Sequence, residues 1–289
     1  MCLHRSGSSG PLSTWVSETQ AKGTTLPCAL AATPRCVLEP HILVVATPAV
    51  VAGMTRRPTV TLLLSANEHP FQLTVGPAAS VQATAALVAP NCSRSLDSRG
   101  CDLLSINVEP GHAMYRALSQ LMGDAPFVCM PRFRFAGLRN EIHAAFENPH
   151  PGADLPLILE ALIMATGAHR CGTSGRDPRV DVVLDRIDAG LPQRRPSLAT
   201  LAHSVSLSED RLSHLFVETI GLPLRSYAVW RRYRRAIGSL ASQIGLTELA
   251  VTVGFADAAH MTRTFNTFFG FSPSFLRRSG FAQMSARVN

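Results

Sequence analysis

The chain has 289 residues, of which 46% are hydrophobic and 16% are charged, so its composition is typical of a globular protein and excludes a disordered one. This length predicts two domains, and no apolar run reaches the roughly 18 residues that a transmembrane helix needs. The formal net charge of +7 is concentrated in residues 176–289, which hold 15 arginines against 9 acidic residues. A basic C-terminal part of this kind is typical of nucleic-acid binding.

Residues 1–36 are rich in Ser, Thr and Gly and lack the apolar block of a signal peptide. We predict a disordered arm there and a cytoplasmic protein. The seven cysteines include no Cys-x-x-Cys pair, which favours free thiols over disulfides or structural zinc. We interpret them as small buried hydrophobic residues. A thiol sensor built from Cys92, Cys101 and Cys129 is the alternative.

Five short apolar or alternating runs predict strands in the first half of the chain. They lie at Ile42–Val45, Thr59–Leu64, Phe71–Val75, Ala83–Val88 and Leu103–Val108. Turn signals such as Gly-Pro and Pro-Asn separate them. Short strands without intervening helices indicate a small antiparallel barrel or sandwich.

Helical periodicity begins after these strands. We expect helices at Met114–Met122, Leu138–Phe146 and Leu155–Ala165. The apolar faces of the last two indicate either core packing or a dimer interface. Residues 167–177 have no apolar periodicity and predict an interdomain linker.

The C-terminal region contains one pattern written twice. Leu201-Ala202, Val205, Leu212, Phe216 and Gly221 recur as Leu249-Ala250, Val253, Met261, Phe265 and Gly270, 48 or 49 residues later. In each copy we predict two short helices. Ser197 and Gly245 are the expected N-caps of the first helices, and Ser208 and Asp257 those of the second. A terminal glycine ends each unit, and the whole pattern predicts two helix-turn-helix units.

One long helix is expected between the units, from Leu224 to Leu240. It contains no proline, and Tyr227, Trp230 and Tyr233 recur at the spacing of a buried stripe. The opposite surface of this helix carries Arg231, Arg232, Arg234 and Arg235, which are suited to phosphate contacts.

Residues 180–280 resemble the DNA-binding domain of the AraC/XylS family of bacterial transcription regulators. The resemblance is carried by Glu248–Ala250, Val253–Phe255, Met261–Phe265 and Phe269–Pro273. It implies an N-terminal cupin-like barrel that binds a small-molecule effector, a homodimer, and activation through RNA polymerase.

Metal-binding cupins need closely spaced histidines and a carboxylate, and this pattern is missing. Arg94 stands where the related loop often shows a histidine, and His41, His69 and His112 lie in unrelated contexts. We therefore predict no metal and no other cofactor. Arg94 is interpreted as a solvated loop arginine, with pairing to an anionic effector as the alternative.

The second helix of each unit is expected to enter the major groove of double-stranded DNA. The resemblance assigns base contacts to Asp210, Ser213 and His214 in the first unit and to Ala258, Ala259, His260 and Arg263 in the second. We expect Arg263 to reach guanine acceptors. Glu209 is interpreted as a helix cap, whereas Asp210 either caps the helix or accepts a hydrogen bond from cytosine.

Phosphate contacts are expected from a separate set of side chains. The predicted residues are Arg211, Arg231, Arg235, Thr262 and Thr267.

The sequence thus predicts an α+β protein with two domains. The expected parts are a disordered arm at 1–36, an effector-binding and dimerisation domain at 37–166, a linker at 167–177, a DNA-binding domain at 178–280 and a tail at 281–289. We predict a sequence-specific transcription regulator that responds to an effector and activates transcription. The alternative is a non-specific architectural or adaptor protein. No catalytic constellation and no membrane segment is expected.

Overall fold

A computed structural model describes residues 29–30, 35–76, 79–147, 155–171, 176–190 and 196–279. Most of the expected arm and the whole expected tail lie outside these residues. Four residues of the predicted arm belong to strands, namely Ala29, Leu30, Arg35 and Cys36, and the Cys36 side chain is fully buried. The sheet structure therefore begins before the predicted boundary at residue 37.

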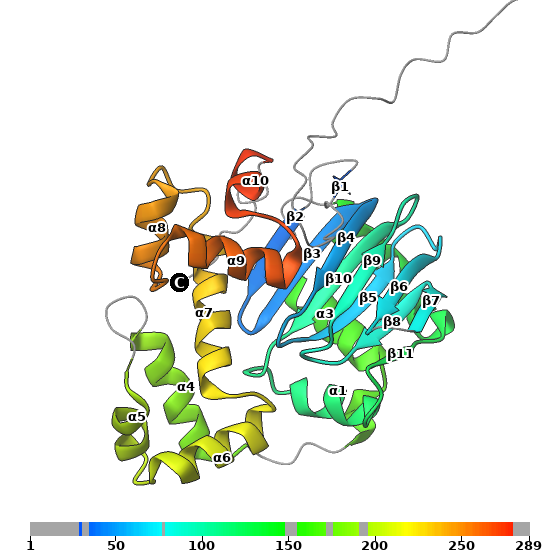
Figure 1. Cartoon of the computed structure of the whole chain (residues 1–289). Helices are drawn as coiled ribbons and strands as arrows, with labels where there is room; N and C mark the ends of the chain where they lie inside the picture. Colours follow the sequence, from blue (N-terminus) through cyan, green and yellow to red (C-terminus); the bar gives the residue numbers. More distant parts are fainter. Residues whose placement is uncertain are drawn as a thin grey trace, which may run out of the picture.

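The N-terminal half is built from two antiparallel sheets (Figure 1). The first has the strand order β1-β4-β9-β6-β7 and the second the order β11-β8-β5-β10-β3-β2. The strands are β1 (Ala29–Leu30), β2 (Arg35–Glu39), β3 (Ile42–Pro48), β4 (Val50–Thr55), β5 (Val60–Ser65), β6 (Phe71–Val75), β7 (Ala79–Ala83), β8 (Ala85–Val88), β9 (Arg94–Asp97), β10 (Asp102–Val108) and β11 (Phe127–Cys129). All five predicted strands are present.

The expected barrel is not closed. No described strand pairs with both sheets, so β1, β7, β11 and β2 remain as sheet edges. Both faces of the second sheet are covered, which is why β5 reads as a continuous apolar run rather than an alternating one. Leu63 and Leu103 face the first sheet, whereas Leu62 and Leu104 face a layer of helices.

The helical layer comprises α1 (Tyr115–Met122), the 3-10 helix η1 (Arg132–Leu138), α2 (Arg139–Glu147) and α3 (Leu155–Ala165). The three helices predicted after the strands are thereby confirmed within one residue at each end. Leu118, Ile142 and Leu159 from these helices belong to the same buried cluster as the outer face of the second sheet. The 3-10 helix η2 (Ala168–Cys171) occupies the start of the predicted linker.

The C-terminal half is entirely helical in the residues described. Its helices are α4 (Pro178–Gly190), α5 (Leu198–Ser204), α6 (Glu209–Ile220), α7 (Leu224–Gly238), α8 (Leu246–Thr252), α9 (Ala258–Phe269) and α10 (Pro273–Arg278). Figure 1 shows α6 and α9 at opposite ends of α7. None of the described helices is both long and apolar enough to cross a bilayer.

The two repeats pack differently. Leu212 and Phe216 of α6 share a separate core with α4 and α5. Phe265 and Phe269 of α9 instead belong to the cluster that also fills the space between the sheets. Tyr233 of α7 stacks on Phe269 with ring centroids 5.5 Å apart. The second repeat is therefore attached directly to the sheets.

Candidate nucleic-acid interface

Both helix-turn-helix units follow the predicted local rules. Ser208 Oγ accepts a hydrogen bond from the Arg211 amide at 3.3 Å, and Asp257 Oδ1 accepts one from the His260 amide at 2.6 Å. Gly221 and Gly270 each end their helix with a φ of 78°, a conformation that costs glycine little. These caps fix where α6 and α9 begin and end.

The turns inside the units also correspond. Ser206, between α5 and α6, has a φ of 53°, and Gly254, between α8 and α9, has a φ of 91°. The two positions are equivalent in the repeat. A positive φ at the same place reverses the chain in the same way in both units, a shared feature that the sequence pattern did not identify because serine at this position carries no obvious signal.

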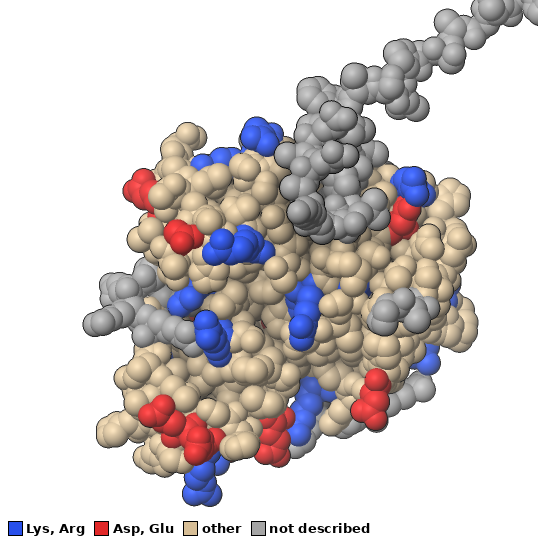
Figure 2. Space-filling model, viewed as in Figure 1, with Lys and Arg blue, Asp and Glu red and all other residues tan. Residues whose placement is uncertain are grey.

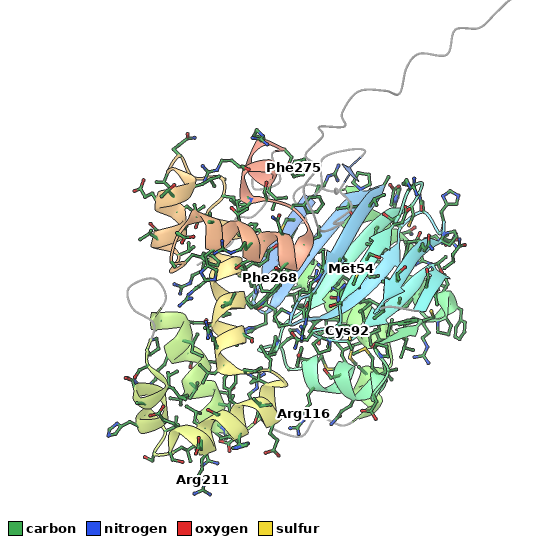
Figure 3. The ribbon with its side chains drawn as sticks, in the orientation of Figure 1. Met54, Cys92, Arg116, Arg211, Phe268 and Phe275 are labelled. Carbon is green, nitrogen blue, oxygen red and sulfur yellow. The ribbon has the colours of Figure 1, made fainter. Side chains whose placement is uncertain are left out.

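The N-terminal part of α6 is accessible. Asp210, Arg211 and His214 are exposed, and Ser213 is half-buried with its hydroxyl donating to the Glu209 carbonyl at 2.9 Å. Arg211 projects from α6 away from the rest of the molecule (Figure 3). Figure 2 shows acidic side chains gathered over α5 and α6 on the same side. The first unit thus presents a mixed rather than a uniformly basic surface.

The corresponding part of α9 carries fewer charges. Ala259 and Arg263 are exposed, whereas Ala258 and His260 are half-buried. The His260 ring packs edge-on against Phe255, with centroids 5.2 Å apart. Arg263 is consequently the predicted base contact of this unit that combines exposure with a long, charged side chain.

Two of the predicted phosphate contacts lie further along α9. The hydroxyls of Thr262 and Thr267 donate to the carbonyls of Ala258 and Arg263, at 2.8 and 2.9 Å. The Thr267 carbonyl accepts a hydrogen bond from the Arg56 amide at 2.7 Å. The C-terminal end of α9 therefore abuts the loop between β4 and β5.

Three α7 arginines bond to Glu109, at the end of the second sheet, or to Asp188 of α4. Arg231 contacts the Glu109 carboxylate at 3.2 Å and the Asp188 carboxylate at 2.7 Å, and Arg234 also pairs with Glu109. Arg235 donates to the Asp188 carbonyl. The Glu109 side chain is fully buried. We call Glu109, Asp188, Arg231 and Arg234 the acidic junction.

Glu109 and Asp188 were not singled out from the sequence. Glu109 directly follows the predicted strand that became β10, and Asp188 lies near the end of α4. The only available signal was an acidic residue beside a buried strand, which does not identify its partner more than 120 residues away.

A second pair of arginines, Arg57 and Arg94, lies near the contact between the sheets and α9, and we call it the arginine pair. Arg94, in β9, donates to the Thr61 hydroxyl of β5 at 2.7 Å. Thr61 donates to Asn107 Oδ1 at 3.1 Å, and Arg57 donates to the same oxygen at 3.3 Å. The arginine pair is therefore connected through neutral side chains of the second sheet.

The burial of Arg94 corrects its interpretation as a solvated loop arginine. Its exposed fraction is 2%, because β9 directs it between the sheets toward β5. Burial lowers the pKa of Arg94 to about 10. The pKa of Arg57 is lowered by burial and, secondarily, by repulsion from Arg94.

Arg57 also connects this region to the second repeat. Its guanidinium lies 3.8 Å from the centroid of the Phe269 ring, a cation–π contact with the last turn of α9. Arg57 Nε and Arg94 Nη1 are buried and have no hydrogen-bond partner. Among the described residues, no carboxylate forms an ion pair with either arginine.

The three cysteines of the alternative thiol cluster have different environments. Cys101 is buried, Cys92 is half-buried and Cys129 is exposed. Burial raises the pKa of the Cys92 and Cys101 thiols, which lowers their thiolate content. Cys101 and Cys36 fit the interpretation as small buried hydrophobic residues, whereas the exposed Cys129 does not.

Of the three histidines considered as metal ligands, His69 and His112 bond to backbone groups, whereas the buried His41 Nδ1 has no hydrogen-bond partner among the described residues. His69 Nδ1 lies 3.1 Å from the Gly100 carbonyl, and His112 Nδ1 accepts from the Met114 amide at 3.2 Å. Within the described ranges, no three His, Cys, Asp or Glu side chains gather as a metal site would require. The absence of a metal stays a prediction.

Comparison with known families identifies the C-terminal repeat. Residues 201–279 match the family described as "Helix-turn-helix domain". The match begins within α5 and continues through α6, α7, α8, α9 and α10.

Solved structures of ToxT from Vibrio cholerae have a similar fold over most of the chain. An apo variant of ToxT is 12% identical, with a TM-score of 0.53, over 85% of this chain and 98% of that one. Another ToxT structure is 12% identical, with a TM-score of 0.54, over 82% and 96%. Wild-type ToxT bound to an unsaturated fatty acid is 11% identical, with a TM-score of 0.51, over 91% and 98%. The β-rich half followed by helix-turn-helix units is thus a known architecture.

Proposed function

From the premise that residues 201–279 are an AraC-type helix-turn-helix DNA-binding domain, we propose that this protein is a sequence-specific transcription regulator. The observation that carries the proposal is the exposure of equivalent surfaces on α6 and α9, each beginning directly after a capped N-terminus. A helix in this position inserts its N-terminal residues into the major groove.

The two units are suited to different base contacts. In the first, Asp210, Ser213 and His214 offer an acceptor and two groups that can donate or accept. In the second, Arg263 can donate to both acceptors of guanine, and Ala258, Ala259 and His260 lie beside it. The alanines are restricted to apolar contact with thymine methyl groups.

Contacts to the DNA phosphates would come from Arg211, Thr262 and Thr267. Arg231 and Arg235 would add further contacts if α7 faces the DNA. In the described arrangement Arg231 is paired with Glu109 and Asp188, and Arg235 with the Asp188 carbonyl. Their use as phosphate contacts therefore requires that Arg231 separates from both carboxylates and Arg235 from the Asp188 carbonyl, so that the acidic junction opens. Such an opening would couple DNA affinity to the N-terminal half.

We further propose that the N-terminal half binds a small-molecule effector and that the protein acts as a homodimeric activator that contacts RNA polymerase. An effector role is supported by the fatty acid bound to a ToxT relative of similar fold. Dimerisation is supported by Leu157 and Met164, which lie seven residues apart on α3 and are 67% and 38% exposed. No catalytic role is proposed.

Footprinting on the DNA upstream of the gene tests the proposal. We expect two protected major-groove segments about one helical turn apart, roughly 34 Å. Arg263→Ala should weaken protection of one segment, and His214→Ala that of the other. Uniform protection of every fragment, unchanged by either substitution, would instead support the non-specific architectural or adaptor protein.

A further inference from the structure

The second helices of the two units, α6 and α9, end beside one loop of the N-terminal half. This loop, Thr55–Pro58, begins at the end of β4 and leads into β5, and we call it the β4–β5 brace. Its Arg56 amide donates to the Thr267 carbonyl at 2.7 Å. Its Arg57 guanidinium lies 3.8 Å from the centroid of the Phe269 ring. The last turn of α9 is therefore bound to the brace by a hydrogen bond and a cation–π contact.

The end of α6 reaches the brace through Tyr115 of α1. Gly221 and Gly270 end α6 and α9 at equivalent positions of the repeat. A Cβ atom built on Gly270 would lie 3.6 Å from Thr55 Cγ2. One built on Gly221 would lie 3.7 Å from Tyr115 Oη, and this hydroxyl donates to the Pro58 carbonyl at 3.4 Å. Both units thus end against the brace or against the tyrosine bonded to it (Figure 1).

The brace is fixed to the sheets. Thr55 Oγ1 donates to the Arg94 carbonyl of β9 at 3.3 Å. The Asn91 amide donates to the Arg57 carbonyl at 2.8 Å, and the Arg57 side chain donates to Asn107 Oδ1 of β10 at 3.3 Å. The Thr55 and Arg57 side chains are buried. Because a movement of the brace relative to the sheets would leave buried polar groups unpaired, such a movement is costly.

The two units have separate cores, and α7 runs from one core to the other. Phe216 and Tyr227 belong to the first core, whereas Trp230 and Phe265 belong to the second. A helix of 15 residues, the length of α7, is about 22 Å long. A bend of α7 between Tyr227 and Trp230 would change the separation of α6 and α9 without disturbing either core. Contacts outside α7 are therefore needed to hold one separation.

We propose that the β4–β5 brace and Tyr115 hold α6 and α9 in one relative position, so that the N-terminal half limits which separation of two major-groove segments the protein accepts. One base pair added between the segments moves the second by about 3.4 Å along the DNA and about 35° around it. Helices in a fixed relative position cannot follow this shift, and the DNA must deform instead. The effect on DNA rests on the proposed function, whereas the fixed position of the helices does not.

Affinity for DNA of altered spacing tests this role. The probes are the upstream fragment protected in footprinting and two derivatives, with one base pair added or removed between the protected segments. We expect the full-length wild type to lose affinity at least about tenfold on either change. Arg57→Gln removes the cation from the Phe269 ring, and Tyr115→Phe removes the hydroxyl that bonds to Pro58. Each of these variants should lose no more than about threefold.

Two matched variants separate the brace from its surroundings. Arg57→Lys keeps a cation beside the Phe269 ring and should restore the wild-type loss. Arg94→Gln changes the same buried polar cluster at a side chain bonded to Thr61, within the sheets, and should also keep the wild-type loss. A variant that is merely less stable would bind all three fragments more weakly by the same factor, so the ratio of affinities isolates the positioning role. Equal losses in the wild type, Arg57→Gln and Tyr115→Phe would overturn the proposal.

Amide hydrogen exchange of the full chain without DNA tests the fixed position directly. We expect Arg57→Gln to speed exchange at least about threefold in the last turns of both α6 and α9, and Arg94→Gln to leave both unchanged. Faster exchange in α9 alone, or in neither helix, would overturn the brace. Faster exchange in both helices with no preference for the upstream fragment supports the brace and contradicts the proposed function. Preferential binding of that fragment with unchanged exchange does the reverse.

Discussion

Two sets of arginines, one half-buried and one buried, lie where the sheets meet the C-terminal helices, and they differ in what neutralises them. At the acidic junction, Arg231 and Arg234 share the fully buried Glu109, and Asp188 adds a second carboxylate. In the arginine pair, Arg57 and Arg94 contact only hydroxyl and amide oxygens and the Phe269 ring. Within the described part of the chain, the first set has carboxylate partners and the second has none.

This difference separates two roles. A complete buried ion pair depends on both partners, because removal of one leaves an uncompensated charge. Two buried like charges without an acid oppose folding, and such an arrangement is maintained where another role favours it. The acidic junction therefore holds the halves of the molecule together, whereas the arginine pair carries buried charge that no described carboxylate neutralises.

The largest expected effect is that of Glu109→Gln. It leaves Arg231 and Arg234 without their buried carboxylate, so we expect a loss of about 3–5 kcal/mol in the free energy of unfolding. Denaturant unfolding measures it. Glu218→Gln, at an exposed position of α6, is the control and should change stability by less than about 0.5 kcal/mol. Equal effects of the two substitutions would mean that the acidic junction does not hold the molecule together.

Replacing an arginine by methionine should change the free energy of unfolding in opposite directions at the two sites. Arg94→Met removes an uncompensated charge while keeping a long side chain, and we expect a gain of about 1–2 kcal/mol. Arg234→Met removes one of the two arginine partners of the buried Glu109 and should destabilise. Because burial lowers the pKa of Arg94 to about 10, below its unfolded value, the gain should be present at neutral pH and diminish as the pH rises through about 10. Destabilisation by Arg94→Met would contradict the proposed difference between the sites.

The smallest effect is expected at the edge of the acidic junction. The Asp188 side chain is 28% exposed and its partner Arg231 is 19% exposed, so solvent screens their interaction. Asp188→Asn should cost no more than about 1 kcal/mol, and the cost should disappear at high salt. Denaturant unfolding of the wild type and Asp188→Asn, at low and at high salt, measures this cost. A loss as large as that of Glu109→Gln, or one independent of salt, would contradict this assignment.

The C-terminal half could be predicted from the sequence because its rules are local. Ser208, Asp257, Gly221 and Gly270 act within a few residues of their own helix, and the repeat presents each signal twice. The strands with continuous or alternating apolar runs were likewise predictable. β4 and β9 were not predicted as defined strands, because β4 contains Gly53 and a register shift, and β9 is mostly polar.

The contacts between residues far apart in the chain could not be predicted. Glu109 meets Arg231 across 122 residues and Arg94 meets Thr61 across 33, and no periodicity encodes such distances. The interpretation of Arg94 as solvated failed for this reason. A lone arginine near a turn signal is usually exposed, and only the packing of one sheet on the other buries it.

Sequence-specific binding through α6 and α9 is the claim on which the proposed function depends. Fluorescence anisotropy should compare an upstream promoter fragment with random DNA for the wild type, Arg263→Ala and the exposed control Arg278→Ala. We predict a preference of about 10³-fold or more for the promoter fragment, reduced by about 1–3 kcal/mol in Arg263→Ala and retained in Arg278→Ala. Equal affinity for both DNAs, unaffected by Arg263→Ala, would contradict sequence-specific regulation.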